Sequence, residues 1–105
     1  MTLNIQALAD LKAAIHEEDS RYCTTISVLN KLAGNGAIDF SEVERTSEAL
    51  QPRRNELKAI AAAADHASNV RNHELSPLPF MPAPAPLTAD EEKLLENAWC
   101  SYFDI

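Results

Sequence analysis

The chain has 105 residues, 46% hydrophobic and 24% charged, which is typical of one folded domain with a modest core. Its formal net charge of −7 argues against direct nucleic-acid binding, because that function requires a basic surface. The composition also argues against a membrane protein, since no apolar run approaches the roughly 18–20 residues needed to cross a bilayer.

The first predicted element is an amphipathic helix over residues 4–33. Asn4 is a suitable N-cap, and Leu3 and Leu8 stand at the two positions of a hydrophobic staple. Apolar side chains recur every seven residues, a pattern typical of a helix that pairs with another helix as in a coiled coil. This stripe consists of Leu8, Ile15, Tyr22 and Leu29, and it is widened by Leu11, Ile26 and Leu32.

A turn is predicted at residues 34–38, because both glycines of the chain lie there. Gly34 follows the last apolar pair of the first helix and suits the left-handed position that often ends a helix. The next helix is expected to begin after Asp39 as N-cap, with Glu42 three residues later completing a capping box. So short a connection predicts a long antiparallel helical hairpin.

The second predicted helix covers residues 39–73 and continues the seven-residue repeat, in Val43, Leu50, Leu57 and Ala64. Pro52 interrupts it, since proline removes a helical hydrogen bond and clashes with the preceding turn. The helix is therefore either kinked near Pro52 or split into 39–50 and 52–73, and we favour the kinked continuous helix.

Two further expectations follow from the hairpin. If the turn centres on Asn35, Glu17 and Glu18 of the first helix come near Arg53 and Arg54 of the second, which places two acids against two bases. The second helix also carries a small-residue patch at 61–64, 67 and 68. This patch reflects either simple helix propensity or a docking surface for the C-terminal helix or a partner.

Residues 76–87, the proline-rich segment, contain five of the six prolines and are expected to form an extended arm in the polyproline II conformation. Twelve such residues reach roughly 37 Å, nearly the length of the hairpin. Phe80 and Met81 interrupt the prolines with apolar bulk, which suggests that the arm lies against a surface.

The last predicted element is a short amphipathic helix within residues 88–105. Thr88 is the expected N-cap, and Glu91 completes a capping box. Its apolar face consists of Leu94, Leu95, Ala98, Trp99, Tyr102 and Ile105. The predicted fold is thus all-α, with a hairpin at 1–75, an arm at 76–87 and a C-terminal helix at 88–105.

The motifs of catalysis are absent from the sequence. Two glycines exclude a phosphate-binding glycine-rich loop, and His66 and His73 are spaced too widely along a helix to share one metal ion. Cys23 and Cys100 lack metal-ligand spacing and are expected to be free buried thiols, with a long-range disulfide as the alternative. We therefore predict no enzyme activity, no catalytic residue, no cofactor and no metal site.

We predict a non-enzymatic protein-interaction or assembly component, such as an adaptor, an assembly chaperone or a small structural protein of a larger particle such as a virion. It would engage itself or a protein partner, and neither nucleic acid, membrane nor small-molecule substrate. The predicted partner-binding residues are Phe80, Met81, Leu95, Trp99, Tyr102 and Phe103, because aromatic side chains dominate interface energetics. The C-terminal helix could equally pack in cis as the third helix of a monomeric core.

One alternative is an acidic inhibitor or nucleic-acid mimic that blocks a basic groove, because residues 76–105 carry one basic and five acidic groups, a net −4. Another is a coiled-coil dimer whose arm recruits a proline-reading domain. The N-terminus lacks the basic stretch of a signal peptide, so a cytoplasmic location is expected, in a host cytoplasm or virion for a viral protein.

Overall fold

The computed structural model describes residues 3–77 and 79–103, and its regular structure consists of three helices. α1 spans Ile5–Gly34, α2 spans Phe40–Leu75 and α3 spans Ala89–Phe103, and none of the described residues forms a strand. The predicted all-α class is confirmed, with helix bounds within about two residues of those expected. Ile105, predicted on the apolar face of the last helix, lies outside the described residues.

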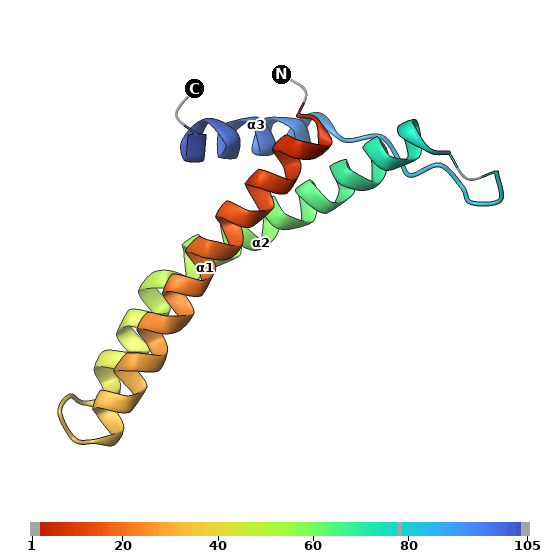
Figure 1. Ribbon diagram of the computed structural model, residues 1–105. Coiled ribbons are helices and arrows are strands. Elements are labelled where there is room, and N and C mark those ends of the chain that lie inside the picture. Colours follow the sequence, from red (N-terminus) through yellow and green to blue (C-terminus); the bar gives the residue numbers. More distant parts are fainter. Residues whose placement is uncertain (1–2, 78, 104–105) are drawn as a thin grey trace.

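The two long helices pack against each other in an elongated hairpin, and α3 lies at its open end (Figure 1). The molecule measures 59 × 34 × 21 Å along its principal axes. Its Cα radius of gyration is 18.0 Å, whereas a compact chain of this length is expected at about 13 Å. Much of the hairpin therefore projects beyond the three-helix core.

Side-chain caps begin the first and third helices as predicted. Asn4 Oδ1 accepts a hydrogen bond from the amide of Ala7 at 2.8 Å. Thr88 and Glu91 form the reciprocal pair of a capping box, in which each side chain accepts from the other residue's amide at 3.1 Å. These bonds satisfy amides that have no partner within the helix.

The second helix begins at the predicted N-cap but without the predicted capping box. Asp39 Oδ1 accepts from the amide of Ser41 at 3.4 Å, two residues along rather than three. The amide of Glu42 is occupied by the backbone carbonyl of Asp39 at 3.0 Å, and the Glu42 carboxylate pairs with Arg45 at 3.5 Å. A local backbone bond and an ion pair thus replace the reciprocal arrangement.

Gly36, rather than Gly34, holds the left-handed conformation in the turn, and the prediction for Gly34 was wrong. Gly36 has φ +78°, whereas Gly34 is the last residue of α1. The amide of Gly36 donates to the carbonyl of Ala33 at 3.1 Å, and that of Ala37 donates to Leu32 at 2.9 Å. These two bonds make a Schellman motif, which ends α1 one residue later than expected.

The core lies at the open end of the hairpin, where α3 packs on both long helices (Figure 1). Burying these side chains supplies most of the stabilisation available to so small a domain. The cluster contains Leu3, Leu8, Leu11 and Ile15 from the N-terminal part, Leu57, Ile60, Ala63, Ala64 and Ala67 from α2, and Leu95 and Ala98 from α3. The small-residue patch of α2 therefore lies in the same cluster as α3.

Pro52 lies inside α2, which is assigned as one helix from Phe40 to Leu75. The prediction that the helix continues through Pro52 is thus supported over a split at this residue, while the kink stays a prediction. The described residues between α2 and α3 have neither helix nor strand. The extended conformation expected for the proline-rich segment likewise stays a prediction.

Candidate functional site

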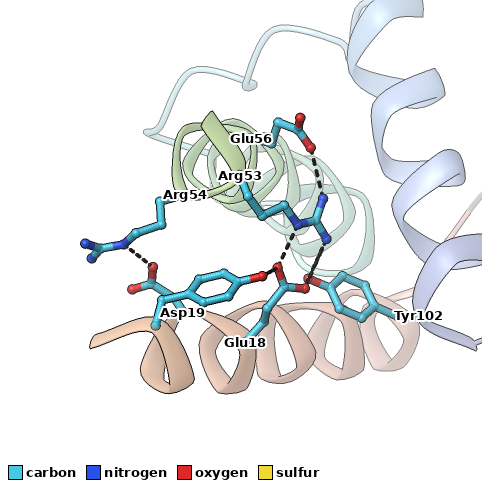
Figure 2. Close-up of polar contacts among 7 residues, drawn as sticks. Glu18, Asp19, Arg53, Arg54, Glu56 and Tyr102 are labelled. Carbon is cyan, nitrogen blue, oxygen red and sulfur yellow. Dashed lines mark hydrogen bonds and ion pairs between the residues drawn. The ribbon is translucent and has the colours of Figure 1, made fainter. Parts of the chain in front are cut away.

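Glu18 lies where all three helices meet, and its carboxylate accepts four hydrogen bonds (Figure 2). Arg53 of α2 donates from Nε at 2.6 Å and from Nη2 at 3.0 Å, one bond to each carboxylate oxygen. Tyr102 of α3 donates its hydroxyl at 2.7 Å, and Tyr22 of α1 donates at 2.6 Å. We call these four residues the Glu18 junction.

The contacts within the Glu18 junction shift the pKa values of Glu18 and Tyr102. Hydrogen bonding from Arg53 lowers the pKa of Glu18 from 4.5 to about 2, against the opposing effect of partial burial. Burial, followed by the bond to Glu18, raises the pKa of Tyr102 to about 12. Because the Glu18 side chain is only 17% exposed, its charge depends on these donors rather than on water.

A second ion pair joins the long helices one position further along each chain. Arg54 Nε donates to Asp19 at 2.9 Å, and its Nη2 lies 3.4 Å from the sulfur of Cys23. The predicted contact of Glu18 with Arg53 is confirmed, whereas Glu17 instead bonds Arg21 of its own helix at 2.8 Å. The residue numbers of these two facing pairs sum to 71 and 73, which is slightly more than a turn centred on Asn35 requires. The turn is therefore centred slightly later in the chain than predicted.

His66 of α2 ties the proline-rich segment and α3 to the hairpin. Its Nδ1 lies 2.7 Å from Glu91 Oε2, and its Nε2 lies 2.7 Å from the backbone carbonyl oxygen of Ala85. Both partner atoms accept hydrogen bonds, so only the doubly protonated imidazolium satisfies both contacts. The bond to Glu91, with that to Ala85, raises the pKa of His66, while the pKa of Glu91 is lowered.

The six predicted partner-binding residues divide into two groups by exposure. Phe80 is 83% exposed, Met81 55% and Phe103 39%, so their side chains meet solvent. By contrast, Leu95 is 4% exposed within the core, and Tyr102 belongs to the Glu18 junction. Trp99 is half-buried against the core, and its ring centroid lies 4.2 Å from that of Phe103.

An open groove runs beside Met81, between the end of α2 and the proline-rich segment. Polar side chains of α2 form one wall, and prolines form the other. The lining residues are Asn69, Asn72, His73, Ser76, Met81, Pro82 and Pro84. Leu75, at the end of α2, is 75% exposed, so apolar side chains gather around this end of the molecule.

Neither cysteine is part of a disulfide or a metal site among the described residues. Cys23 and Cys100 are both free thiols, but Cys23 is exposed and Cys100 is half-buried, so the prediction that both are buried was wrong. It lies on the solvent side of α1, where Arg54 reaches it. Among the described residues, no three histidine, cysteine or acidic side chains form a group that could hold a metal ion. No described helix has the length and apolarity to cross a membrane.

Comparisons with protein-family models, with curated proteins and with solved structures find no match for this chain. Function is therefore inferred from the molecule's own geometry. Reasoning from sequence missed the two tyrosine contacts of the Glu18 junction and the contacts of His66. The spacing of Glu18 and Tyr22, four residues apart on one helix, is the one local signal that could have indicated part of this network.

Proposed function

We propose that this chain is a non-enzymatic interaction or assembly component, such as an adaptor, an assembly chaperone or a small structural protein of a larger particle such as a virion. It engages itself or a protein partner through the proline-rich segment and α3. The exposure of Phe80, at 83%, is the observation that carries the proposal. A phenylalanine in water gains about 1.5–3 kcal/mol when it is buried in a partner's pocket.

The surroundings of Phe80 support a binding surface rather than a lone exposed side chain. Leu75 and Met81 add apolar area at 75% and 55% exposure. The neighbouring groove has polar walls from Asn72 and Ser76. An apolar centre with a polar rim is the usual composition of a non-obligate protein interface.

Within this proposal, the aromatic residues of the C-terminal part have two roles. Phe80, Met81 and Phe103 contact the partner, because their side chains are accessible. Leu95 and Tyr102 hold α3 on the hairpin, through the core and the Glu18 junction respectively. Trp99 supports the position of Phe103, against which its ring packs.

The finer shape is also part of the proposal. The proline-rich segment is expected to be an extended arm, since five prolines in twelve residues favour polyproline II and reduce the entropy lost on binding. A kink near Pro52 would turn the core half of α2 relative to the projecting half, because Pro52 has no amide to donate to Glu48. We place the protein in the cytoplasm, or in a virion if its source is a virus.

Photocrosslinking tests this proposal, because a crosslinker at position 80 captures whichever chain packs against it. Benzoylphenylalanine is close to phenylalanine in shape and can replace Phe80 in the full chain expressed in its native source. The matched control carries the same group at Lys58, an exposed position on α2. We expect defined crosslinked products from position 80, either to a second copy or to one partner. Equal, diffuse crosslinking from positions 80 and 58 would overturn the proposal.

The alternative of an acidic inhibitor makes a different prediction about salt. Residues 76–105 carry a net −4, which could occupy a basic groove. Binding that depends on charge weakens steeply as salt rises, whereas burial of Phe80 and Met81 does not. Once crosslinking has identified the partner, its affinity for the unmodified chain can be measured from low to high salt. The salt dependence of that affinity distinguishes the two functions.

A further inference from the structure

His66 contacts the segment that carries the proposed partner-binding surface. The proline-rich segment leaves the end of α2, turns back and passes the last turns of α2 on its way to α3 (Figure 1). The carbonyl oxygen of Ala85 lies 2.7 Å from His66 Nε2, and Glu91 Oε2 of α3 lies 2.7 Å from His66 Nδ1. Among the described residues, no other hydrogen bond joins α2 to residues 79–87. One imidazole therefore ties this part of the segment to the hairpin.

Deprotonation of His66 breaks one of these two contacts, and the chemistry of the acceptors decides which. A neutral imidazole has one N–H and a lone pair on its other nitrogen. A proton on Nε2 would leave the Nδ1 lone pair facing the ionised carboxylate of Glu91, whereas a proton on Nδ1 keeps a charge-assisted bond to that carboxylate. The proton therefore stays on Nδ1, and the lone pair of Nε2 repels the carbonyl oxygen of Ala85. Deprotonation thus releases the proline-rich segment and keeps the contact with α3.

Glu91 is the one charged side chain among the described residues that shifts the pKa of His66. The bond to Glu91 and then the bond to Ala85 raise this pKa, against the opposing effect of burial. The proline-rich segment contains no charged side chain, and the neighbouring Asp65 is bound by Lys12 of α1 at 2.8 Å. The other titratable side chains within two turns of these residues on α2 and α3 are Arg71, His73, Asp90, Glu92, Lys93 and Glu96.

We propose that His66 is a proton-operated latch, which holds the proline-rich segment on α2 when it is protonated and releases the segment when it is neutral. The consequence for binding rests on the proposed function, because the segment carries Phe80 and Met81. In the latched state, the contact at Ala85 fixes the adjacent Pro84, which lines the groove together with Met81. A fixed surface loses less conformational entropy on binding than a mobile one. The partner is therefore expected to bind more tightly to the protonated chain.

The rest of the fold is expected to keep its shape when the latch opens. Leu87 packs against the core, and the capping box of Thr88 and Glu91 begins α3 without help from the imidazole. At the other end, the amide of Ser76 donates to the carbonyl of Asn72 at 2.9 Å and closes α2. Release is therefore confined to the part of the segment between these two anchors.

Methyl relaxation by NMR tests the latch in the purified full chain, without any partner. The methyl groups of Ala83 and Ala85 report motion of the segment on the picosecond-to-nanosecond timescale. From about pH 5 to about pH 9, their order parameters should fall from about 0.8 toward about 0.6, with the midpoint of the His66 imidazole titration. His66→Gln should remove this pH dependence. His73→Gln is the matched control, because His73 lines the same groove from α2, and it should leave the pH dependence in place.

Two results of this measurement would overturn the latch. One is that the order parameters stay constant while His66 titrates. The other is a pH dependence that H66Q retains, and its loss in H73Q alone would assign the titration to His73. Circular dichroism checks that the helices of both variants remain.

Photocrosslinking from position 80 measures the consequence for binding. The purified chain carrying benzoylphenylalanine is mixed with an extract of its native source. The defined product should form roughly threefold or more better at about pH 6 than at about pH 8 when His66 is present, and equally at both pH values in H66Q. Equal yields with His66 present would overturn the regulation of binding. Absence of a defined product at both pH values would instead contradict the proposed function, and the relaxation measurement would still decide the latch.

Discussion

Arg53 donates to both carboxylate oxygens of Glu18, at 2.6 and 3.0 Å, across 35 residues of sequence. This bidentate pair sets the register of α1 against α2, because a guanidinium and a carboxylate align in one plane. Tyr102 bonds the same carboxylate from α3 at 2.7 Å. One acidic side chain thus bonds side chains of all three helices and fixes their relative positions (Figure 2).

Removal of the Glu18 charge is expected to destabilise the fold. Glu18→Gln keeps the shape of the side chain but removes the charge that strengthens all four bonds of the Glu18 junction, so the free energy of unfolding should fall by about 2 kcal/mol. Glu17→Gln is the control, because Glu17 is 69% exposed and its bond to Arg21 is local. That change should stay within about 0.5 kcal/mol. Equal effects of both variants in urea denaturation would contradict the role of the junction.

Tyr102→Phe tests whether the junction also holds α3. Loss of the hydroxyl bond to Glu18 should cost about 1 kcal/mol. In a double-mutant cycle with E18Q, the effects should not add, since the two side chains share that bond, and a coupling of about 0.5 kcal/mol or more is expected. Strict additivity would show that α3 is held elsewhere.

The decrease in the free energy of unfolding at acid pH should depend on Glu18. Its pKa is lowered from 4.5 to about 2 in the folded chain, chiefly by the bond from Arg53. A lowered carboxyl pKa stabilises the fold above pH 4.5, and this contribution is lost as the pH falls from 4.5 toward 2. The urea midpoints of unfolding of wild type and E18Q should therefore converge as the pH falls over this range. Parallel curves down to pH 2 would contradict the assignment.

His66 should give a second pH dependence of opposite sign. Its pKa is raised above 6.5, first by the bond to Glu91 and then by that to the carbonyl of Ala85. A raised histidine pKa stabilises the fold below pH 6.5, and the contribution is lost as the pH rises through the folded pKa. Above that pH, one of the two bonds fails, and the proline-rich segment should loosen near Ala85.

An NMR titration of the imidazole measures this directly. Glu91→Gln removes the carboxylate and should move the pKa of His66 downward, while α3 keeps its helix. Relative to the intrinsic rise of exchange with pH, amide exchange of Ala85 and Leu87 should quicken in wild type as His66 deprotonates, and His66→Gln should remove that excess. An imidazole pKa that E91Q leaves unchanged would contradict the contact with Glu91.

Local rules predicted the helices well, because the seven-residue repeats and the caps at Asn4 and Thr88 act over a few neighbours. The contact of Glu18 with Arg53 was also predictable, since a short turn fixes which residues face each other. The contact of Tyr102 with Glu18 was not predictable, because it spans 84 residues and depends on where the proline-rich segment positions α3. His66 was considered only as a metal ligand, and no local pattern connects it to Glu91, 25 residues away.

The glycines of the turn offer a pair of substitutions with opposite signs. A Cβ at either position would meet nothing within 4 Å, so backbone conformation alone decides the outcome. Gly36→Ala forces alanine into φ +78° and should destabilise the fold by about 1 kcal/mol. Gly34→Ala replaces a helical glycine and should stabilise it by up to about 1 kcal/mol. Thermal unfolding of both variants decides the matter, and a stabilised G36A would contradict the turn geometry.

The docking of α3 on its own hairpin can be tested through Leu95. This side chain is 4% exposed and lies in the core cluster with Leu8 and Leu57. Leu95→Ala should therefore lower the free energy of unfolding by about 2–4 kcal/mol, through lost burial and the cavity that remains. Leu75→Ala makes the same chemical change at 75% exposure and should cost no more than about 0.5 kcal/mol. If α3 were instead held only by a second molecule, the effect of L95A would grow with protein concentration. The cis arrangement requires that effect to be the same at every concentration measured.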